Sequence, residues 1–453
     1  MKIQRFLFSV CVVQLLLMTG SCSPYTPQAD YGQIEKTVDS IIKPYIDSLS
    51  IAGMAIGVMR EDSIIFSKAY GFADLEYEIP LPANASFQIG SITKQFTAVG
   101  IMQLAEKGIL DLDENISEYI QFEHKEYDPT IRQLLNHTSG IRGHNNLPGF
   151  RPLLMREIIR DTMVRLVEKE PFDFEPGTVM LYSNTGYVIL GLIIEKLTGQ
   201  TYEEYTTEHI LSKSGMDNTF FCDRTAIRKF RAHGYNFVDG GKYRAEEPYY
   251  YWTYSAGALC STIEDLLKWN KALHDGNAVL NKVSYAELIK PGQLENGVKL
   301  SYAKGLQRYR KNGREVIAHG GSGSGILAEL MYFPEKKISL VTLENSYRRE
   351  NWFAIADALL DELIPVTLDK TAYEGDLSIL QGTYEGNWQV RIENADNHLL
   401  IENESATIDT LSYLGEARWS FKGNEYFFTK GKGGEQYLHM DMIYALLSFT
   451  KKE

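Results

Sequence analysis

The stretch Gln88-Ile89-Gly90-Ser91-Ile92-Thr93-Lys94 carries the strongest chemical signal in this chain of 453 residues. Apolar residues recur at helical spacing from Gln95 to Lys107, and Gly108 stands where a glycine commonly ends a helix. Ser91 and Lys94 are three positions apart, so they share one face of this helix. Backbone N–H groups at a helix N-terminus favour negative charge on a serine oxygen, and a desolvated lysine can take the serine proton. The stretch predicts an activated serine or, as the alternative, a helix cap beside a solvated lysine.

A second segment, Tyr182-Ser183-Asn184, precedes another helical pattern at Thr185–Leu197, which Gly199 closes. A tyrosine beside a lysine can act as a proton shuttle, because the positive charge lowers the pKa of its phenol. Asn184 lies two positions after Tyr182, on the same side of an extended segment, where it can bind a substrate amide. Taken alone, the segment is more typical of a helix-entry turn with a core tyrosine.

A third segment, His319-Gly320-Gly321-Ser322-Gly323-Ser324-Gly325, leads into a predicted strand at Leu327–Phe333. Glycines on a strand allow a substrate backbone to approach closely. The segment does not match the phosphate-loop pattern, and Ser324 stands where the pattern G-x-S-x-G needs its last glycine. The alternative is that His319 is a strand-end histidine, hydrogen-bonded in the core.

The order S-x-x-K, Y-x-N and H-x-G resembles the serine β-lactamase and penicillin-binding-protein superfamily, in the branch nearest to class C β-lactamases. Three flanking segments are similar to motifs of that branch, and the resemblance covers residues 36–365. These segments are Leu134-Leu135-Asn136-His137-Thr138-Ser139-Gly140, Phe174-Glu175-Pro176-Gly177 and Ser255-Ala256-Gly257-Ala258-Leu259.

The resemblance implies that Ser91 is an acylated nucleophile and that Lys94 and Tyr182 handle its proton. The backbone N–H groups of Ser91 and Ser322 would form the oxyanion hole. The implied reaction is two-step acyl transfer on a small molecule or peptide, with no metal or organic cofactor. The residues implied in substrate binding are Asn184, His319, Gly320, Gly321 and Ser322.

The third motif departs from the K-T-G found in penicillin-binding proteins and many β-lactamases. That lysine helps to hold a substrate carboxylate, whereas His319 is mostly neutral at pH 7 and a weaker anchor. The H-x-G form resembles D-aminopeptidases and esterases of the branch, so we expect hydrolysis of an ester, an amide or a D-amino-acid or cell-wall-derived peptide. The alternatives are a true β-lactamase and a protein that binds or senses penicillin or peptidoglycan fragments without turnover.

Two further histidines follow the first motif. His137 belongs to a segment that is normally structural in the branch, and the lysine–tyrosine pair needs no histidine base. We therefore expect no catalytic role for His137. His144 is predicted to line the edge of the cleft.

Strand patterns at both ends of residues 36–365 predict one sheet with a helical block between them. Ile51–Met59 and Ser63–Phe66 indicate a hairpin, Ile338–Leu343 a late strand, and Thr262 the N-cap of a helix that ends at His274. The resemblance implies an α/β (α+β) fold, with an antiparallel sheet flanked by helices and a helical subdomain beside it.

Residues 372–453 have short apolar segments, frequent turn signals and weak helical periodicity. This composition predicts a small all-β domain, either a barrel or a sandwich. The segment resembles the lipocalin-like domains appended to some relatives in the branch. It would either shape the cleft or pack beside it without a role.

The N-terminus predicts export. Lys2 and Arg5 precede the apolar run Phe6–Met18, which is too short to cross a bilayer and matches a signal peptide over residues 1–21. The small residues before Cys22 resemble a lipoprotein signal, with Cys22 lipidated at the membrane and a polar tether over 22–35. We expect a periplasmic or cell-envelope lipoprotein; the alternative is a simple secretory signal.

Composition limits the partners and the redox chemistry. There are 46 Lys+Arg against 59 Asp+Glu, a net charge of −13, which argues against nucleic acid or an anionic membrane surface as a partner. In an exported protein Cys222 and Cys260 are free to form a disulfide, and two separate buried thiols are an equal alternative.

Overall fold

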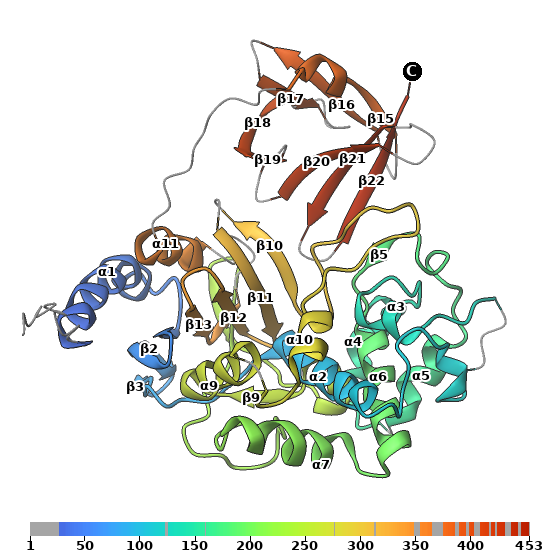
Figure 1. Ribbon diagram of the computed structural model, residues 1–453. Coiled ribbons are helices and arrows are strands. Elements are labelled where there is room, and N and C mark those ends of the chain that lie inside the picture. The colour runs from blue at the N-terminus through green and yellow to red at the C-terminus, as the bar shows by residue number, and fades with distance from the viewer. Residues whose placement is uncertain are drawn as a thin grey trace, which may run out of the picture.

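The computed structural model comprises a large mixed body with a smaller β-structure above it (Figure 1). It describes residues 27–122, 126–158, 160–275, 277–311, 314–347, 354–364, 375–385, 389–395, 398–402, 408–415, 418–421, 424–430, 436–442 and 445–452. The predicted signal peptide and Cys22 lie outside these residues.

The body is built around a seven-stranded sheet in the order β10-β11-β12-β13-β1-β2-β3. The first hairpin of the chain pairs directly with a strand from the far end of the body, since β1 lies antiparallel to β13. The sheet built from both chain ends is therefore confirmed. Its strands are β1 (Gly53–Arg60), β2 (Ser63–Asp74), β3 (Ile79–Pro80), β10 (Gln307–Lys311), β11 (Arg314–Gly323), β12 (Ile326–Phe333) and β13 (Ile338–Glu344).

Strand β1 reads as a continuous apolar run because both of its faces are buried. Met54, Ile56 and Val58 face a core shared with helices α1 (Pro27–Asp47) and α11 (Ala354–Leu363). Gly57 faces helix α9 (Ile263–His274), and a Cβ on this glycine would lie 2.2 Å from Ile263 Cγ2. The missing side chain thus lets α9 pack directly on the sheet.

The other helices form the predicted helical block and cover the sheet face that carries α9. The helix expected from Gln95 begins at Thr93, and the helix expected from Thr185 begins at Asn184 and ends at Gly199, which has a φ of +71°. The Thr262 side chain caps α9 by accepting a hydrogen bond from the Asp265 N–H. These helices are α2 (Thr93–Glu106), α3 (Ile131–Leu135), α4 (Phe150–Leu153), α5 (Arg160–Val167), α6 (Asn184–Thr198), α7 (Tyr202–Thr206), α8 (Tyr254–Gly257) and α10 (Lys282–Leu288).

Helix α1 begins inside the segment expected to be a polar tether over 22–35. Ile34, Val38 and Ile42 recur every four residues and are buried against the sheet and α11. This apolar stripe explains why the chain is helical from Pro27 despite its polar composition. Residues 22–26 lie outside the described part of the chain.

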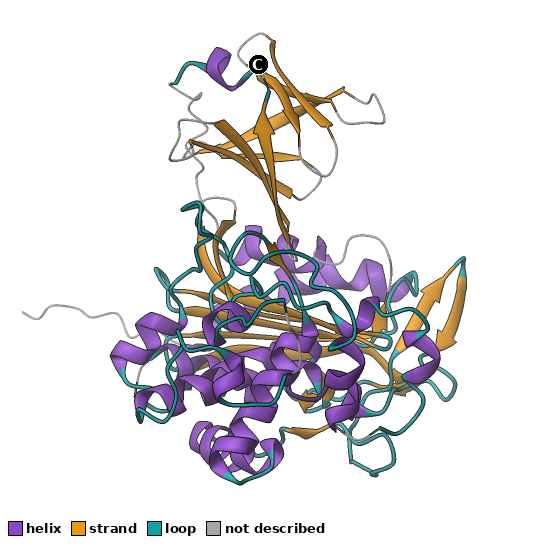
Figure 2. Ribbon diagram, turned by 90° about the vertical axis from the view of Figure 1, so that its right-hand side faces the viewer, coloured by secondary structure: helices purple, strands orange, loops and turns teal. Residues whose placement is uncertain are grey.

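The C-terminal strands form an antiparallel sheet that closes on itself, because β15 pairs with both β16 and β22 (Figure 2). Its interior is apolar and includes Tyr384, Trp419 and Leu438. Strand β5 (Met180–Leu181), from the helical block, joins this sheet next to β22. The other strands are β15 (Gly382–Glu385), β16 (Gln389–Ala395), β17 (His398–Glu402), β18 (Ile408–Gly415), β19 (Arg418–Phe421), β20 (Asn424–Lys430), β21 (Gln436–Met442) and β22 (Ala445–Lys451).

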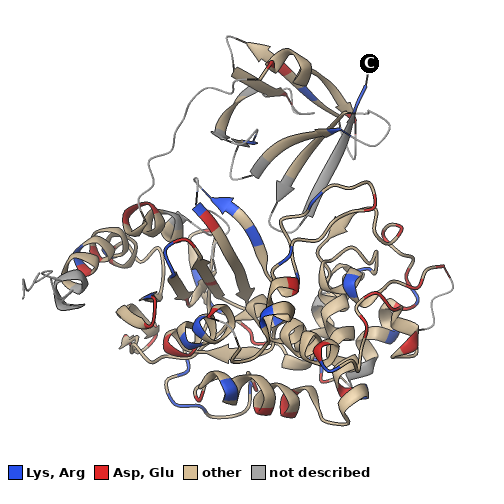
Figure 3. Ribbon diagram, in the orientation of Figure 1, with Lys and Arg blue, Asp and Glu red and all other residues tan. Residues whose placement is uncertain are grey.

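The predicted fold class is confirmed: an antiparallel sheet flanked by helices, a helical block and a small all-β C-terminal part. Basic and acidic residues are interspersed along the elements of the body in the view of Figure 3. No helix within the described ranges is long and apolar enough to span a membrane.

Candidate active site

Ser91 lies in a tight turn between the sheet and the helical block. Strand β4 (Phe87–Gln88) leads into a 3₁₀ turn, Gly90–Ile92, which continues directly into α2. Gly90 has a φ of +49°, and a Cβ on it would lie 2.5 Å from the Ser322 carbonyl oxygen and 2.8 Å from the Ser322 nitrogen. The backbones of the serine turn and of β11 are therefore in close contact, and only glycine suits this position.

Gly321 makes the matching approach from β11. A Cβ on Gly321 would lie 1.9 Å from the Ile89 carbonyl oxygen and 3.3 Å from the Ser91 nitrogen. The two backbone N–H groups predicted to form an oxyanion hole, those of Ser91 and Ser322, thus belong to two segments in contact. Preorganised donors of this kind are worth about 2.7–4 kcal/mol each to a developing negative charge.

Lys94 is fully buried, and three oxygens surround its amine. Its Nζ lies 3.1 Å from Ser91 Oγ, 2.6 Å from Asn184 Oδ1 and 2.7 Å from the Ala256 carbonyl oxygen. No carboxylate is among these partners. Burial therefore holds the pKa of Lys94 well below its usual 10.5.

The neighbours of Lys94 also determine which way its amine points when it is neutral. The amide oxygen of Asn184 and the carbonyl oxygen of Ala256 can only accept hydrogen bonds, so they take the two N–H groups of a neutral amine. The lone pair then faces Ser91, whose hydroxyl can donate to it. The arrangement can remove the serine proton.

The ring of Tyr182 covers the amine of Lys94, and Tyr182 directly follows β5, the strand that pairs with β22 of the C-terminal sheet. The Lys94 Nζ lies 4.8 Å from the centre of the Tyr182 ring, and the Tyr182 hydroxyl is buried. His137 packs on the same ring, with the two ring centres 4.1 Å apart. The structure thus brings Ser91, Lys94 and Tyr182 together, as the motifs predicted.

His137 holds the Tyr182 segment from one side. It has a left-handed backbone with a φ of +61°. Its carbonyl oxygen accepts a hydrogen bond from Leu181 N at 3.0 Å, and its Nδ1 accepts one from Ser183 N at 3.2 Å. Burial, and then the nearby charge of Lys94, hold the pKa of His137 well below 6.5. His137 is therefore a positioning residue, as expected, and is neutral.

His319 is buried, with protein partners at both ring nitrogens. Its Nδ1 donates to the Gly320 carbonyl oxygen at 2.5 Å, so its Nε2 accepts from the Tyr302 hydroxyl at 3.0 Å. Burial, followed by the Lys94 charge, lowers the pKa of His319 to about 3. The ring is hydrogen-bonded in the core, as in the alternative interpretation, but His319 lies within β11 and not at a strand end. The site thus has a neutral ring at the position of the lysine in the K-T-G motif.

Asn184 links two parts of the site. Its Oδ1 accepts from Lys94, and its Nδ2 donates to Asn145 Oδ1 at 2.9 Å. The sequence pointed to Asn184 as a substrate ligand, and the structure shows that it also orients the lysine. Its role toward a substrate stays a prediction.

The prediction for His144 is wrong. We expected it at the edge of the cleft, but it is 1% exposed. Its backbone N–H and its Nδ1 both contact Thr185 Oγ1, at 2.8 and 3.1 Å. Thr185 is buried in the first turn of helix α6, and its two contacts hold His144 in the core.

Two contributors to the site were missed by sequence reasoning. The Ala256 carbonyl oxygen binds Lys94, but a backbone group leaves no signal in residue type. Tyr302 binds His319 from a loop before β10, and no motif marks it. In the sequence the segment 255–259 stands out only by its family resemblance, and the contact of the Ala256 carbonyl oxygen with Lys94 gives that resemblance a physical reason.

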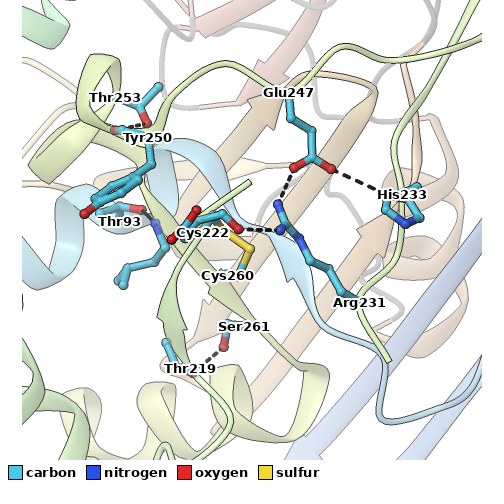
Figure 4. The surroundings of a disulfide bond; sticks show 12 residues. Thr93, Thr219, Cys222, Arg231, His233, Glu247, Tyr250, Thr253, Cys260 and Ser261 are labelled. Carbon is cyan, nitrogen blue, oxygen red and sulfur yellow. Dashed lines mark hydrogen bonds and ion pairs between the residues drawn. A yellow bond between two sulfur atoms is a disulfide. The ribbon is translucent and has the colours of Figure 1, made fainter. Parts of the chain in front are cut away.

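A disulfide braces the strand behind the serine turn (Figure 4). Cys222 and Cys260 are bonded, which settles the open question of their pairing. The bond links the segment after β6 (Phe220–Phe221) to β9 (Leu259–Ser261), which pairs with β4. The Leu259 carbonyl oxygen also accepts from the Ile89 N–H at 2.9 Å. The disulfide thus supports the strand on which the Ser91 turn rests.

Two adjacent glycines of β11 provide a matched test of the turn's geometry. Gly321→Ala places a methyl group against the Ile89 carbonyl, so we expect the rate of Ser91 labelling by a fluorophosphonate to fall at least about 100-fold. In Gly320→Ala the methyl group meets only the flexible end of Glu329, 2.5 Å away, so labelling should stay within about threefold. Equal labelling rates in the two variants would contradict the assigned contact.

The lowered pKa of Lys94 predicts a pH dependence with a definite sign. A charged amine cannot take the Ser91 proton, so labelling should speed up as pH rises through the Lys94 pKa, and level off well below pH 10.5. Lys94→Arg keeps its charge at every pH and should lose at least about 100-fold in rate. A rate that keeps rising until about pH 10.5, or normal labelling of the arginine variant, would argue against this role.

Known proteins are similar to the part of the chain that contains the three motifs. The Beta-lactamase family model matches residues 38–363. Penicillin-binding protein 4* of Bacillus subtilis is 29% identical over 299 residues, which cover 62% of this chain and 65% of that protein. A second penicillin-binding protein of that organism is 30% identical over 57% of this chain and 64% of its own. The chain thus spans less than two thirds of the length of these curated relatives.

Solved structures share the fold. D-amino acid amidase from Ochrobactrum anthropi SV3 superposes with a TM-score of 0.64 at 23% identity, covering 73% of this chain and 98% of that one. The octameric penicillin-binding protein homologue from Pyrococcus abyssi has a TM-score of 0.63 at 24% identity and covers 92% of this chain and 100% of its own. Because the family model matches most of the chain, the chain belongs to the beta-lactamase family, within the superfamily of serine β-lactamases and penicillin-binding proteins that its three motifs indicated.

Proposed function

We propose that this protein is a serine hydrolase that cleaves an ester or amide through an acyl-enzyme on Ser91. The observation that carries the proposal is the contact of 3.1 Å between Ser91 Oγ and a fully buried Lys94 amine. The two other partners of that amine accept hydrogen bonds, so its lone pair faces the serine.

The first half-reaction acylates the serine. Ser91 Oγ attacks the substrate carbonyl carbon while Lys94 takes the hydroxyl proton. The N–H groups of Ser91 and Ser322 bind the developing oxyanion. The C–N or C–O bond then breaks, and the proton reaches the leaving nitrogen or oxygen from Lys94 through Tyr182.

The second half-reaction releases the acid. Water adds to the acyl carbon and gives a proton to the same pair. The acyl–Oγ bond breaks, the proton returns to Ser91 Oγ, and the product acid leaves. Since the same groups move the proton in both directions, no further residue is required.

A substrate without a carboxylate at the His319 position fits this site best. His319 is neutral and both of its nitrogens bind protein groups, so it offers no positive charge to a carboxylate. Amides, esters and D-amino-acid peptides meet this condition. Two structural neighbours, a D-amino acid amidase and a D-stereospecific amidohydrolase from Streptomyces, support the D-amino-acid class.

Intact mass spectrometry of the full chain after fluorophosphonate treatment tests the nucleophile. Wild-type protein should gain one adduct, and Ser91→Ala should gain none. Ser322→Ala, which keeps the backbone N–H groups, is the matched control and should still be labelled. An adduct that persists in Ser91→Ala would refute the assignment.

Turnover separates the hydrolase from the alternatives. With D-aminoacyl amides and simple esters we expect released acid in excess over enzyme. A stable adduct with penicillin and no product would favour a binding or sensing protein, and rapid penicillin hydrolysis a true β-lactamase.

We also propose that the protein is exported and anchored through a lipid on Cys22. The supporting observation is the apolar run Phe6–Met18 followed by small residues before the cysteine. Wild-type protein expressed in a bacterium should sediment with membranes, and Cys22→Ala should be released into the soluble envelope fraction. Wild-type protein found soluble, starting at a residue other than Cys22, would contradict the anchor.

A further inference from the structure

The C-terminal barrel shares one of its strands with the candidate active site. Strand β21 occupies one edge of β22 along its whole length. On the other edge, Thr450 and Lys451 pair with β15 and close the barrel, whereas Ala445 and Leu446 pair with Leu181 and Met180 of β5. Strand β5 thus fills the part of the β22 edge that β15 leaves open.

Strand β5 is the segment that leads directly into Tyr182. His137 binds this segment from one side through the N–H groups of Leu181 and Ser183. Strand β22 binds it from the other side. A strand of two residues has little stability of its own, so the position of Tyr182 depends on these two neighbours.

A side chain of the barrel reaches the same place. Tyr426 and Phe428 of β20 pack into the barrel core, so Phe427 points outward, as alternation along a strand requires. Phe427 and Tyr182 each pack against one small apolar cluster, which consists of Met180, Leu294, Val298, Leu300 and Tyr302. Tyr302 in turn donates to His319.

We propose that the C-terminal barrel helps to form the active site. Strand β22 and Phe427 position the segment that holds Tyr182 over Lys94. Phe427 is a positioning residue in this arrangement. The proposal rests on the hydrolase function proposed above. In this proposal the barrel contributes to catalysis and does not merely pack beside the cleft.

The arrangement has a chemical consequence for Lys94. Besides its three oxygen partners, the amine lies 4.8 Å from the centre of the Tyr182 ring and 5.5 Å from that of Tyr187. The other titratable groups that it influences electrostatically are His137, His144 and His319. Burial lowers the pKa of each of the three histidines and raises the pKa of Tyr187, so these side chains are neutral, and the amine itself is shielded from water. Loosening Tyr182 admits water beside Lys94, which stabilises the charged amine and raises its pKa toward the ordinary value.

Phe427→Ala in the full chain tests the proposal, with Ser91 labelling by a fluorophosphonate as the readout. We expect the maximal labelling rate to fall about tenfold, and the rising limb of the pH–rate profile to move to higher pH by about one unit. Phe427→Leu keeps an apolar contact, so it should restore most of the rate and return the rising limb of the pH–rate profile to its wild-type position. If Phe427 only stabilised the fold, its loss would not shift the pH of this rising limb.

Phe428→Ala is the matched control, because it removes the neighbouring ring from the barrel core. It should lower the melting temperature of the barrel but leave the rate and the pH limb at 25 °C unchanged. If Phe427→Ala matched wild type, or if Phe428→Ala shifted the limb equally, the proposed contact would be wrong. Ser91 would still be labelled in both cases, so these outcomes would not affect the assignment of Ser91 as the nucleophile, which the Ser91→Ala variant tests.

Hydrogen exchange on the wild-type chain tests the strand pairing without any variant. The Leu181 and Ser183 amides bind His137, so the amide of Met180, which is paired with Leu446, is the informative one. It should be protected to the same degree as the amides of β21 and β22, and exchange at an unprotected rate beside protected barrel strands would overturn the proposal.

Discussion

The burial of one amine is the constraint on which the site depends. Lys94 is fully buried, and the three oxygens within hydrogen-bonding reach come from the serine turn, from helix α6 and from the segment before β9. A buried ammonium without a carboxylate partner is costly, so the amine favours its neutral form. In the mechanism proposed above, that preference makes the lysine of the common S-x-x-K motif the base for Ser91.

Each part of the fold contributes to this arrangement. The sheet brings β11 against the serine turn, and the two glycines Gly90 and Gly321 allow the backbones to meet. The helical block presents Tyr182 and Asn184 at the start of α6. Strand β9, braced by the Cys222–Cys260 disulfide, supports the turn from behind. The C-terminal barrel adds its own strand to the tyrosine segment, so residues far apart in sequence depend on one another around a single amine.

Local patterns allowed much of this to be predicted from sequence. The hairpin at β1–β2, the Thr262 cap and the helix after Ser91 follow from periodicity and turn residues within a few positions. The carbonyl of Ala256, the Tyr302–His319 hydrogen bond and the β5–β22 pairing could not be predicted, because they join distant segments through backbone atoms or unmarked side chains. The tether prediction overlooked the stripe of Ile34, Val38 and Ile42, since its partner helix, α11, comes much later in the chain.

The charge state of Lys94 is the central claim, and it can be measured directly. Protein labelled with ¹⁵N at lysine side chains gives an Nζ signal for Lys94 that Lys94→Arg identifies by its absence. Its titration should place the Lys94 pKa well below 10.5, with the amine neutral over the range in which Ser91 reacts. A Lys94 signal that stays in the ammonium form up to its ordinary pKa would contradict the account.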